Sequence, residues 1–278
     1  MEYNTYNNTD IKPEQPAPYP NLTQSWGLFG MFFVFSLGAG ILFTPLSKIK
    51  YDLMDSVVSL LSYVLTFVLL FVYVKFQLDS RQQKFEIKQN KIPVTVLILL
   101  LLITPLLSIV IEPLMSWLPM PAWFEEIMGK MVKPNAVSFL SVVVAAPICE
   151  EVLCRGIILE GLLRNKLKPT DAILWSSLIF AALHLNPWQG VSAFALGCLM
   201  GWAYYKTRSL WSSIFIHFVN NGLAFVLLIF YPDPNMTSQD MFGGRYFMVY
   251  VGALVAVVIL GAMLYSFYDS KKIENKHD

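Results

Sequence analysis

Three polar groups interrupt long apolar stretches of this sequence, and their side chains are of types that catalyse hydrolysis. The groups are Glu150, Glu151 and Arg155 in the first, His184 in the second, and His217 and Asn221 in the third. An ionised Asp, Lys or Arg at the centre of a membrane helix costs roughly 2.5–3.5 kcal/mol, so charged residues there normally face a bundle interior or a wet cavity. A carboxylate, two imidazoles and an amide that converge in such a cavity can activate water and stabilise an oxyanion.

The spacing of the first group separates its two glutamates. Glu151 and Arg155 are four residues apart with the acid first, which favours an ion pair within one helix. Glu150 lies about 100° further round the same helix and has no such partner. We therefore expect Glu150 to be the carboxylate available for chemistry. A buried pair that only fixes helix packing is an equally good interpretation of Glu151 and Arg155.

Depth in the membrane indicates that the three groups can meet. His217 and Asn221 share a helix face because they are four residues apart. At about 1.5 Å per residue, Glu150 and His184 each lie roughly 20 Å into their spans, His217 roughly 10 Å and Asn221 roughly 16 Å. One layer of the bundle can therefore contain all four. Either histidine alone is better explained by a hydrogen bond between helices.

The composition indicates that a membrane surrounds these residues. The chain has 278 residues, of which 56% are hydrophobic and 14% charged, and its mean hydropathy is +0.55, values that do not describe a soluble globular protein. With 20 Lys and Arg against 19 Asp and Glu, it lacks the basic excess of a nucleic-acid binder. The three cysteines fall in apolar runs and are interpreted as buried hydrophobic residues.

Uncharged apolar runs long enough to cross a bilayer predict an all-α polytopic membrane protein of about eight transmembrane helices, with the catalytic cavity inside the bundle. The expected spans are 26–46, 55–74, 94–111, 136–163, 171–187, 190–205, 210–231 and 247–268. The boundary between the fifth and sixth spans is the hardest to place, because both are short and are joined by Asn186-Pro187-Trp188-Gln189-Gly190.

The distribution of positive charge predicts the orientation. Lys and Arg gather in the N-terminal segment, in the connections after the second, fourth and sixth spans, and in the C-terminal tail. This places both termini in the cytoplasm. The expected organisation is a flexible N-terminal segment at 1–25, a transmembrane helical domain at 26–268 and a cytoplasmic tail at 269–278.

Taken together, the motifs Glu150-Glu151-x-x-x-Arg155, Phe180-x-x-x-His184 and His217-x-x-x-Asn221 resemble the CPBP intramembrane protease family, also called Abi or CAAX-protease-like, which includes the type II CAAX prenyl endopeptidases. The resemblance covers roughly 136–225. It implies an intramembrane endopeptidase in which Glu150 is the general base and His184 helps to hold the attacking water. His217 and Asn221 would then stabilise the oxyanion, while Glu151 and Arg155 would orient the fourth helix or contact the substrate.

The resemblance leaves two cofactor assignments open. Members of the family are commonly described as metalloproteases, and Glu150, His184 and His217 are the ligand types of a zinc site with an open position. The sequence has no HExxH motif, however, and the family has also been interpreted as metal-free. We favour the metal-free assignment, because Glu150 can act as a base without a cation. A divalent metal such as zinc is the alternative.

The expected partners are the lipid bilayer and a peptide or membrane-protein substrate, with no nucleic acid. A prenylated substrate is implied only at the level of the family. The charge distribution fits a cell membrane, and the short architecture is typical of a bacterial protein. Two other functions compete: a non-catalytic scaffold that keeps the protease fold, and a transporter, since intramembrane Glu and Arg often mark translocation paths. The transporter hypothesis lacks an evident pair of broken repeats.

Overall fold

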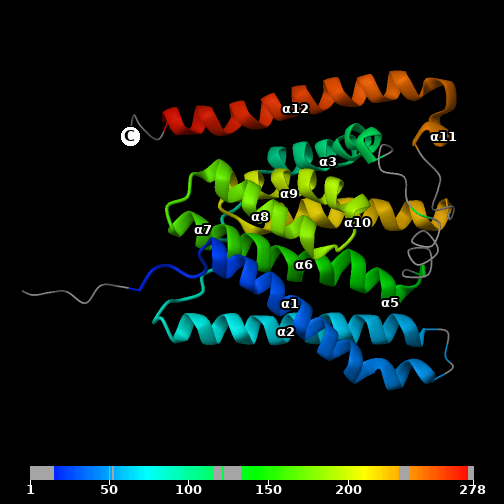
Figure 1. Cartoon of the computed structure of the whole chain (residues 1–278). Coiled ribbons are helices and arrows are strands. Elements are labelled where there is room, and N and C mark those ends of the chain that lie inside the picture. The colour runs from blue at the N-terminus through cyan, green and yellow to red at the C-terminus, as the bar shows by residue number, and fades with distance from the viewer. Residues whose placement is uncertain are drawn as a thin grey trace, which may run out of the picture.

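A computed structural model of the chain describes residues 16–49, 51, 53–115, 121, 133–231 and 238–274. Its α-helices are α1 (Leu22–Phe43), α2 (Met54–Asp79), α3 (Val94–Met115), α5 (Ala136–Phe139), α6 (Ala146–Glu151), α7 (Glu160–Arg164), α8 (Pro169–Leu183), α9 (Pro187–Thr207), α10 (Leu210–Phe230), α11 (Ser238–Phe242) and α12 (Tyr246–Glu274). Short 3₁₀ segments lie at Thr44–Lys48 and Gly243–Arg245, and π-helical segments at Leu140–Ala145 and Val152–Leu159. The expected all-α architecture is therefore confirmed (Figure 1).

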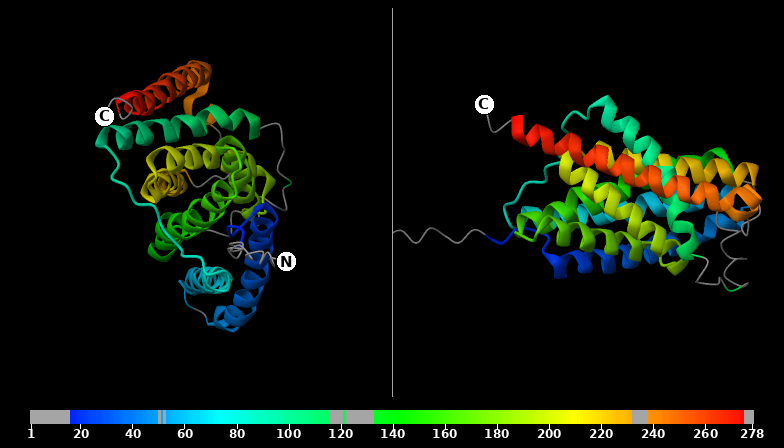
Figure 2. Two further views of the ribbon diagram at one scale, coloured as in Figure 1. Left: turned by 90° about the vertical axis from the view of Figure 1, so that its left-hand side faces the viewer. Right: turned by 90° about the horizontal axis from the view of Figure 1, so that it is seen from above.

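The long helices lie side by side, and the helices that carry the polar motifs form the centre of the bundle (Figures 1 and 2). There α8 packs on α9, and α10 packs on both α9 and α6. On one side α1 pairs with α2, and on the other α12 covers α3. The largest shared core includes Leu153, Ile179, Met200 and Ile216, all fully buried. Polar motif residues are thus enclosed by the other helices.

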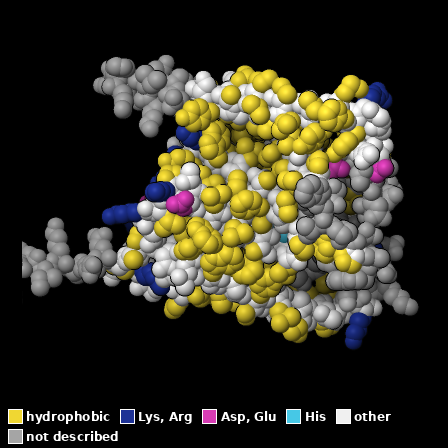
Figure 3. All heavy atoms as spheres, turned by 45° about the horizontal axis from the view of Figure 1, so that its top comes forward, with side chains coloured by type: hydrophobic (Ala, Val, Ile, Leu, Met, Phe, Trp, Pro, Cys, Tyr) yellow, Lys and Arg dark blue, Asp and Glu magenta, His cyan; other side chains and the backbone are white. Residues whose placement is uncertain are grey.

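Each of the eight expected spans coincides with a helical segment. Within the described ranges, six helical segments are long and apolar enough to cross a membrane: Leu22–Lys48, Met54–Asp79, Val94–Leu114, Ala136–Arg164, Leu210–Phe230 and Gln239–Tyr268. Of the other two, α8 is apolar but has only 15 residues, whereas α9 is long enough but less apolar. The count of eight crossings stays a prediction. Apolar side chains cover the face seen in Figure 3, with charged ones toward its two ends, as suits a multi-pass membrane protein.

The fourth expected span is not a uniform α-helix. It starts at α5, where the Asn135 side chain accepts hydrogen bonds from two backbone N–H groups, and π-helical segments then flank α6 on both sides. In the first π segment the Ala146 N–H bonds to the Ser141 carbonyl, five residues back. The same pattern would pair the Val142 carbonyl with residue 147, which is a proline and has no N–H. Val142 therefore needs another donor.

The chain before α1 is held against the bundle from Pro16 onward. The Gln83 side chain accepts from the Tyr19 N–H and donates to two carbonyls of this segment, while Arg164 and Asn165 donate to others. Tyr19 is buried, and burial raises the pKa of its hydroxyl to about 12. The described part of the expected flexible segment therefore packs against the bundle, and α1 starts at Leu22 rather than 26. The flexibility of the segment stays a prediction. Residues 1–15 lie outside the described residues.

Both ends of the described chain lie at the same end of the bundle (Figure 1). This agrees with an even number of crossings. The last helix, α12, continues to Glu274, into the segment expected to be a tail. The side of the membrane that these ends face stays a prediction.

Candidate active site

The Glu151–Arg155 pair lies at the centre of the site. Arg155 Nη1 donates to Glu151 Oε1 at 2.9 Å, and both side chains are fully buried. This confirms the ion pair predicted from the spacing. Arg155 Nη2 donates to the Gly197 carbonyl on α9 at 2.8 Å, and the guanidinium carbon lies 4.8 Å from the centre of the Phe180 ring on α8. One arginine thus joins three central helical segments.

The same glutamate oxygen orients His217. His217 Nδ1 lies 3.0 Å from Glu151 Oε1, and because a carboxylate oxygen only accepts, Nδ1 donates this hydrogen bond. The opposite nitrogen, Nε2, is 3.9 Å from Glu150 Oε2. The imidazole therefore lies between the two glutamates and is bonded to one of them.

Glu150 has one occupied and one open carboxylate oxygen. Tyr63 on α2 donates its hydroxyl to Oε1 at 2.8 Å. Oε2 is buried and has no hydrogen-bond partner among the described residues, although the side chain as a whole is 16% exposed. A water oxygen about 2.8 Å from both Glu150 Oε2 and His217 Nε2 would see them at an angle of about 90°, near the angle between its own O–H bonds. The pair is therefore spaced to share one water.

His184 lies at the end of α8 rather than inside a span, because the helix ends at Leu183. Its Nδ1 is 2.9 Å from the Phe180 carbonyl, which can only accept, so Nδ1 donates and Nε2 is left for another interaction. The Phe180 ring contacts both imidazoles edge to face, with centroids 5.0 Å from His184 and 5.3 Å from His217. Phe180 therefore brings the second motif beside the third.

Asn221 supplies the donor that Val142 needs. Its Nδ2 donates to the Val142 carbonyl at 2.9 Å, and its Oδ1 accepts from Asn220 at 3.1 Å. This ties α10 to the π-helical turn just before α6, one helical turn beyond His217. One of the two amide N–H groups of Asn221 is used in this contact, and the other is left for a further acceptor.

Sequence reasoning missed Tyr63 and the carbonyl of Gly197. Tyr63 is 87 residues from Glu150, and a tyrosine in an apolar span gives no sign of which helix its hydroxyl reaches. Gly197 contributes through its backbone and its lack of a side chain, since an added Cβ would lie 3.0 Å from the Ser177 Cβ and 3.3 Å from Arg155 Nη2. Both contacts depend on how distant helices pack.

A metal site needs several ligands grouped together. In the part of the chain that is described, no three His, Cys, Asp or Glu side chains are grouped so that they could hold a metal ion. Glu150, His184 and His217 are not among such groups, and their assignment as metal ligands stays a prediction.

Comparison with known proteins identifies the motif region. Residues 132–223 match the family model of the Rce1-like type II CAAX prenyl endopeptidases, and this range contains all six predicted site residues. Neither the curated proteins nor the solved structures contain a match to this chain. The resemblance inferred from the motifs is thus confirmed. The protein is a multi-pass membrane protein in which residues 132–223, about a third of the chain, are similar to the Rce1-like endopeptidases, consistent with the CPBP and CAAX protease family.

We predict that Arg155→Met destabilises the protein by roughly 3–5 kcal/mol, because it leaves Glu151 buried without its cation. Arg208→Met is the matched control: Arg208 pairs with Glu160 at 3.3 Å, but its side chain is 37% exposed. Unfolding of the purified variants in detergent, followed by intrinsic fluorescence, measures both changes. Equal losses in the two variants would contradict the central role of the buried pair.

Proposed function

We propose that the protein is an intramembrane endopeptidase in which Glu150 activates the attacking water. One observation carries the proposal: Glu150 Oε2 is buried, lacks a partner among the described residues and lies 3.9 Å from His217 Nε2. An unpaired buried carboxylate oxygen is costly and is well suited to accept a proton. The match to an endopeptidase family supports the same conclusion.

In the proposed reaction, water donates one hydrogen to Glu150 Oε2 and the other to His217 Nε2. Its oxygen attacks the carbonyl carbon of the peptide bond as a proton passes to Glu150. The carbonyl π electrons move to oxygen and form a tetrahedral oxyanion. When the C–N bond breaks, the Glu150 proton moves to the leaving nitrogen, so the products are a new carboxyl terminus and a new amine.

The geometry favours a changed role for His217. The resemblance implies that His217 stabilises the oxyanion, but its Nδ1–H is used by Glu151, so in the neutral ring Nε2 is an acceptor that can orient water. We assign the oxyanion contact to the second amide N–H of Asn221. His184 has Nε2 left for another interaction, and we propose that it helps to hold the water, the role that the resemblance implies.

Glu151 and Arg155 act as positioning residues in this scheme. Both are fully buried, and their polar contacts go to His217, to Gly197 and to each other. Their role is to keep the His217 imidazole facing Glu150. We propose this role in place of the substrate contact that the sequence analysis considered for them. Correct placement is a large part of catalysis, because misplacement of a reacting group by about 1 Å can cost roughly 10²-fold in rate.

The proposed substrate is a peptide segment associated with the membrane, and prenylation is not a requirement of the scheme. The proposed location is a bacterial cell membrane, with both termini in the cytoplasm. In this orientation the segment that starts at Pro16 and the connection between α2 and α3 face the cytoplasm.

We predict that Glu150→Gln abolishes proteolysis while the protein remains folded. Glutamine keeps an oxygen that accepts from Tyr63 but cannot take up the proton, and general bases contribute roughly 10²–10⁴-fold to rate. New N- and C-termini of membrane proteins are compared in cells carrying the wild type or the variant at matched abundance.

Glu86→Gln, which changes an exposed carboxylate, is the control and should give the wild-type pattern. If cells with Glu150→Gln contain the same new termini as cells with the wild type, Glu150 is not the general base. If no termini depend on the wild type and Glu150→Gln restores a deletion phenotype, the scaffold function is correct instead.

We predict that Tyr63→Phe lowers kcat by about 10- to 100-fold and leaves KM nearly unchanged. The substitution removes one hydrogen bond to a charged group, worth about 1.5–3 kcal/mol, and lets the Glu150 carboxylate turn. Tyr73→Phe on the same helix is the control. Its hydroxyl makes no hydrogen bond within the described structure. The assay is cleavage of a synthetic peptide that spans a cleavage site found by comparing membrane-protein termini in cells. Equal rates for the two variants would show that Tyr63 does not position Glu150.

A further inference from the structure

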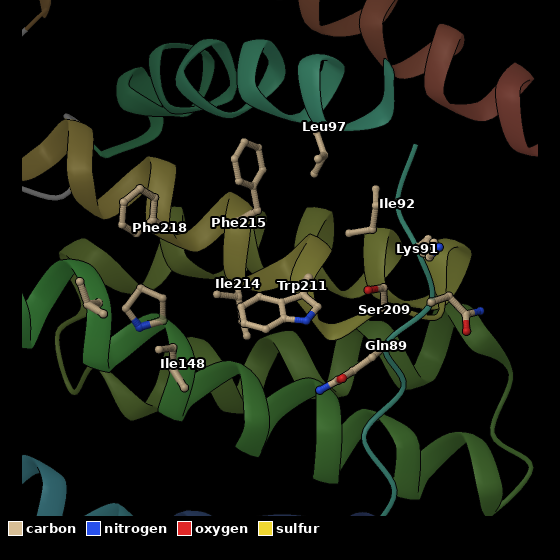
Figure 4. A pocket seen from close by; sticks show the side chains of 13 residues that line it. Gln89, Lys91, Ile92, Leu97, Ile148, Ser209, Trp211, Ile214, Phe215 and Phe218 are labelled. Carbon is tan, nitrogen blue, oxygen red and sulfur yellow. The ribbon is translucent and has the colours of Figure 1, made fainter. Parts of the chain in front are cut away.

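A cavity of about 570 Å³ lies between α3, α6 and α10, beside the candidate active site (Figure 4). This volume is within the range of roughly 300–1,000 Å³ that is usual for ligand sites. None of the six proposed site residues lines it. The cavity is therefore distinct from the candidate active site.

The walls of the cavity change character along its length. Leu97, Phe215, Phe218 and Ile148 point into the space from three helical segments and make it apolar (Figure 4). The polar lining residues come from one place, where the chain at Gln89–Lys91 crosses the start of α10. An occupant must therefore be apolar for most of its length and polar at one end.

The polar end offers a free donor and a cation. Ser209 Oγ is fully buried and has no hydrogen-bond partner in the described ranges. The Lys91 side chain is exposed, and no acidic partner for it occurs among the described residues. A buried hydroxyl and an unpaired ammonium group are complementary to ester and phosphate oxygens.

We propose that this cavity binds one acyl chain of a glycerophospholipid, with the ester group at Ser209 and the phosphate at Lys91. An extended peptide does not fit the walls, because its amide groups would face apolar side chains and lose their hydrogen bonds. An alkyl chain has no such groups to satisfy. The anionic phosphate also matches the positive charge of Lys91.

The bound chain has a structural consequence for the active site. Pro147 and Ile148 lie just before Glu150 on α6, and Ile214 and Phe218 lie on either side of His217 on α10. A chain packed against both pairs braces the two helices that hold Glu150 and His217. The lipid therefore supports the 3.9 Å separation of Oε2 and Nε2 without touching either atom.

Native mass spectrometry of the purified full chain, with phosphatidylglycerol or phosphatidylcholine added to the detergent, tests the proposal without any protease assay. We expect one tightly bound phosphatidylglycerol per chain. Lys91→Gln should weaken its binding about fivefold, since one lysine near a membrane surface contributes about that factor. The same variant should weaken phosphatidylcholine binding less, because the choline group already compensates the charge of that lipid's phosphate. Leu97→Trp, which fills the cavity, should abolish tight binding of both lipids.

Lys168→Gln is the matched control, because Lys168 is exposed and does not line the cavity. It should bind both lipids as the wild type does. Lipid binding by Leu97→Trp at the wild-type level would overturn the site. Equal effects of Lys91→Gln and Lys168→Gln on phosphatidylglycerol would overturn the assignment of the phosphate to Lys91.

Discussion

A single carboxylate oxygen, Glu151 Oε1, organises the candidate site. It accepts from Arg155 at 2.9 Å and from His217 at 3.0 Å, in surroundings where both charged side chains are fully buried. Either bond alone would leave a buried group short of a partner, and such groups cost several kcal/mol. The two bonds together fix the imidazole so that its other nitrogen faces Glu150. In the proposed reaction, Glu150 thus depends on a neighbour, Glu151, that need not touch the substrate.

The backbone of the fourth span makes this arrangement possible. The segments on both sides of α6 are π-helical, a rare geometry that is frequent at functional sites. Pro147 leaves the Val142 carbonyl without a backbone donor, and the Asn221 side chain donates to it instead. The hydrogen bond that satisfies the Val142 carbonyl therefore also holds α10 beside the start of α6. The neighbouring apolar cavity is lined by other residues of these two helices, so the proposed lipid would contact the same helices that hold Glu150 and His217.

The spacing of residues along a helix and the apolar runs were sufficient to predict part of the fold and part of the candidate site. The Glu151–Arg155 pair follows from four-residue spacing on one helix, and the helices follow from long apolar segments. Depth reasoning also placed His184 near His217, although α8 ends before His184. Tyr63 could not be predicted, because its contact with Glu150 depends on how α2 packs. The hydrogen bond from Asn221 to Val142 could not be predicted either. It depends on a π-helical turn, and such a turn leaves no repeating pattern in the sequence.

The tautomer of His217 tests this account most directly. Nitrogen-15 NMR of the full chain in lipid bilayers distinguishes the protonated from the bare ring nitrogen, and a His217→Asn sample identifies the signals. The account predicts a proton on Nδ1, donated to Glu151, and a bare Nε2 facing Glu150, with this preference weakened in Glu151→Leu. A proton on Nε2 together with a bare Nδ1 would contradict it, because His217 would then be held by something other than Glu151.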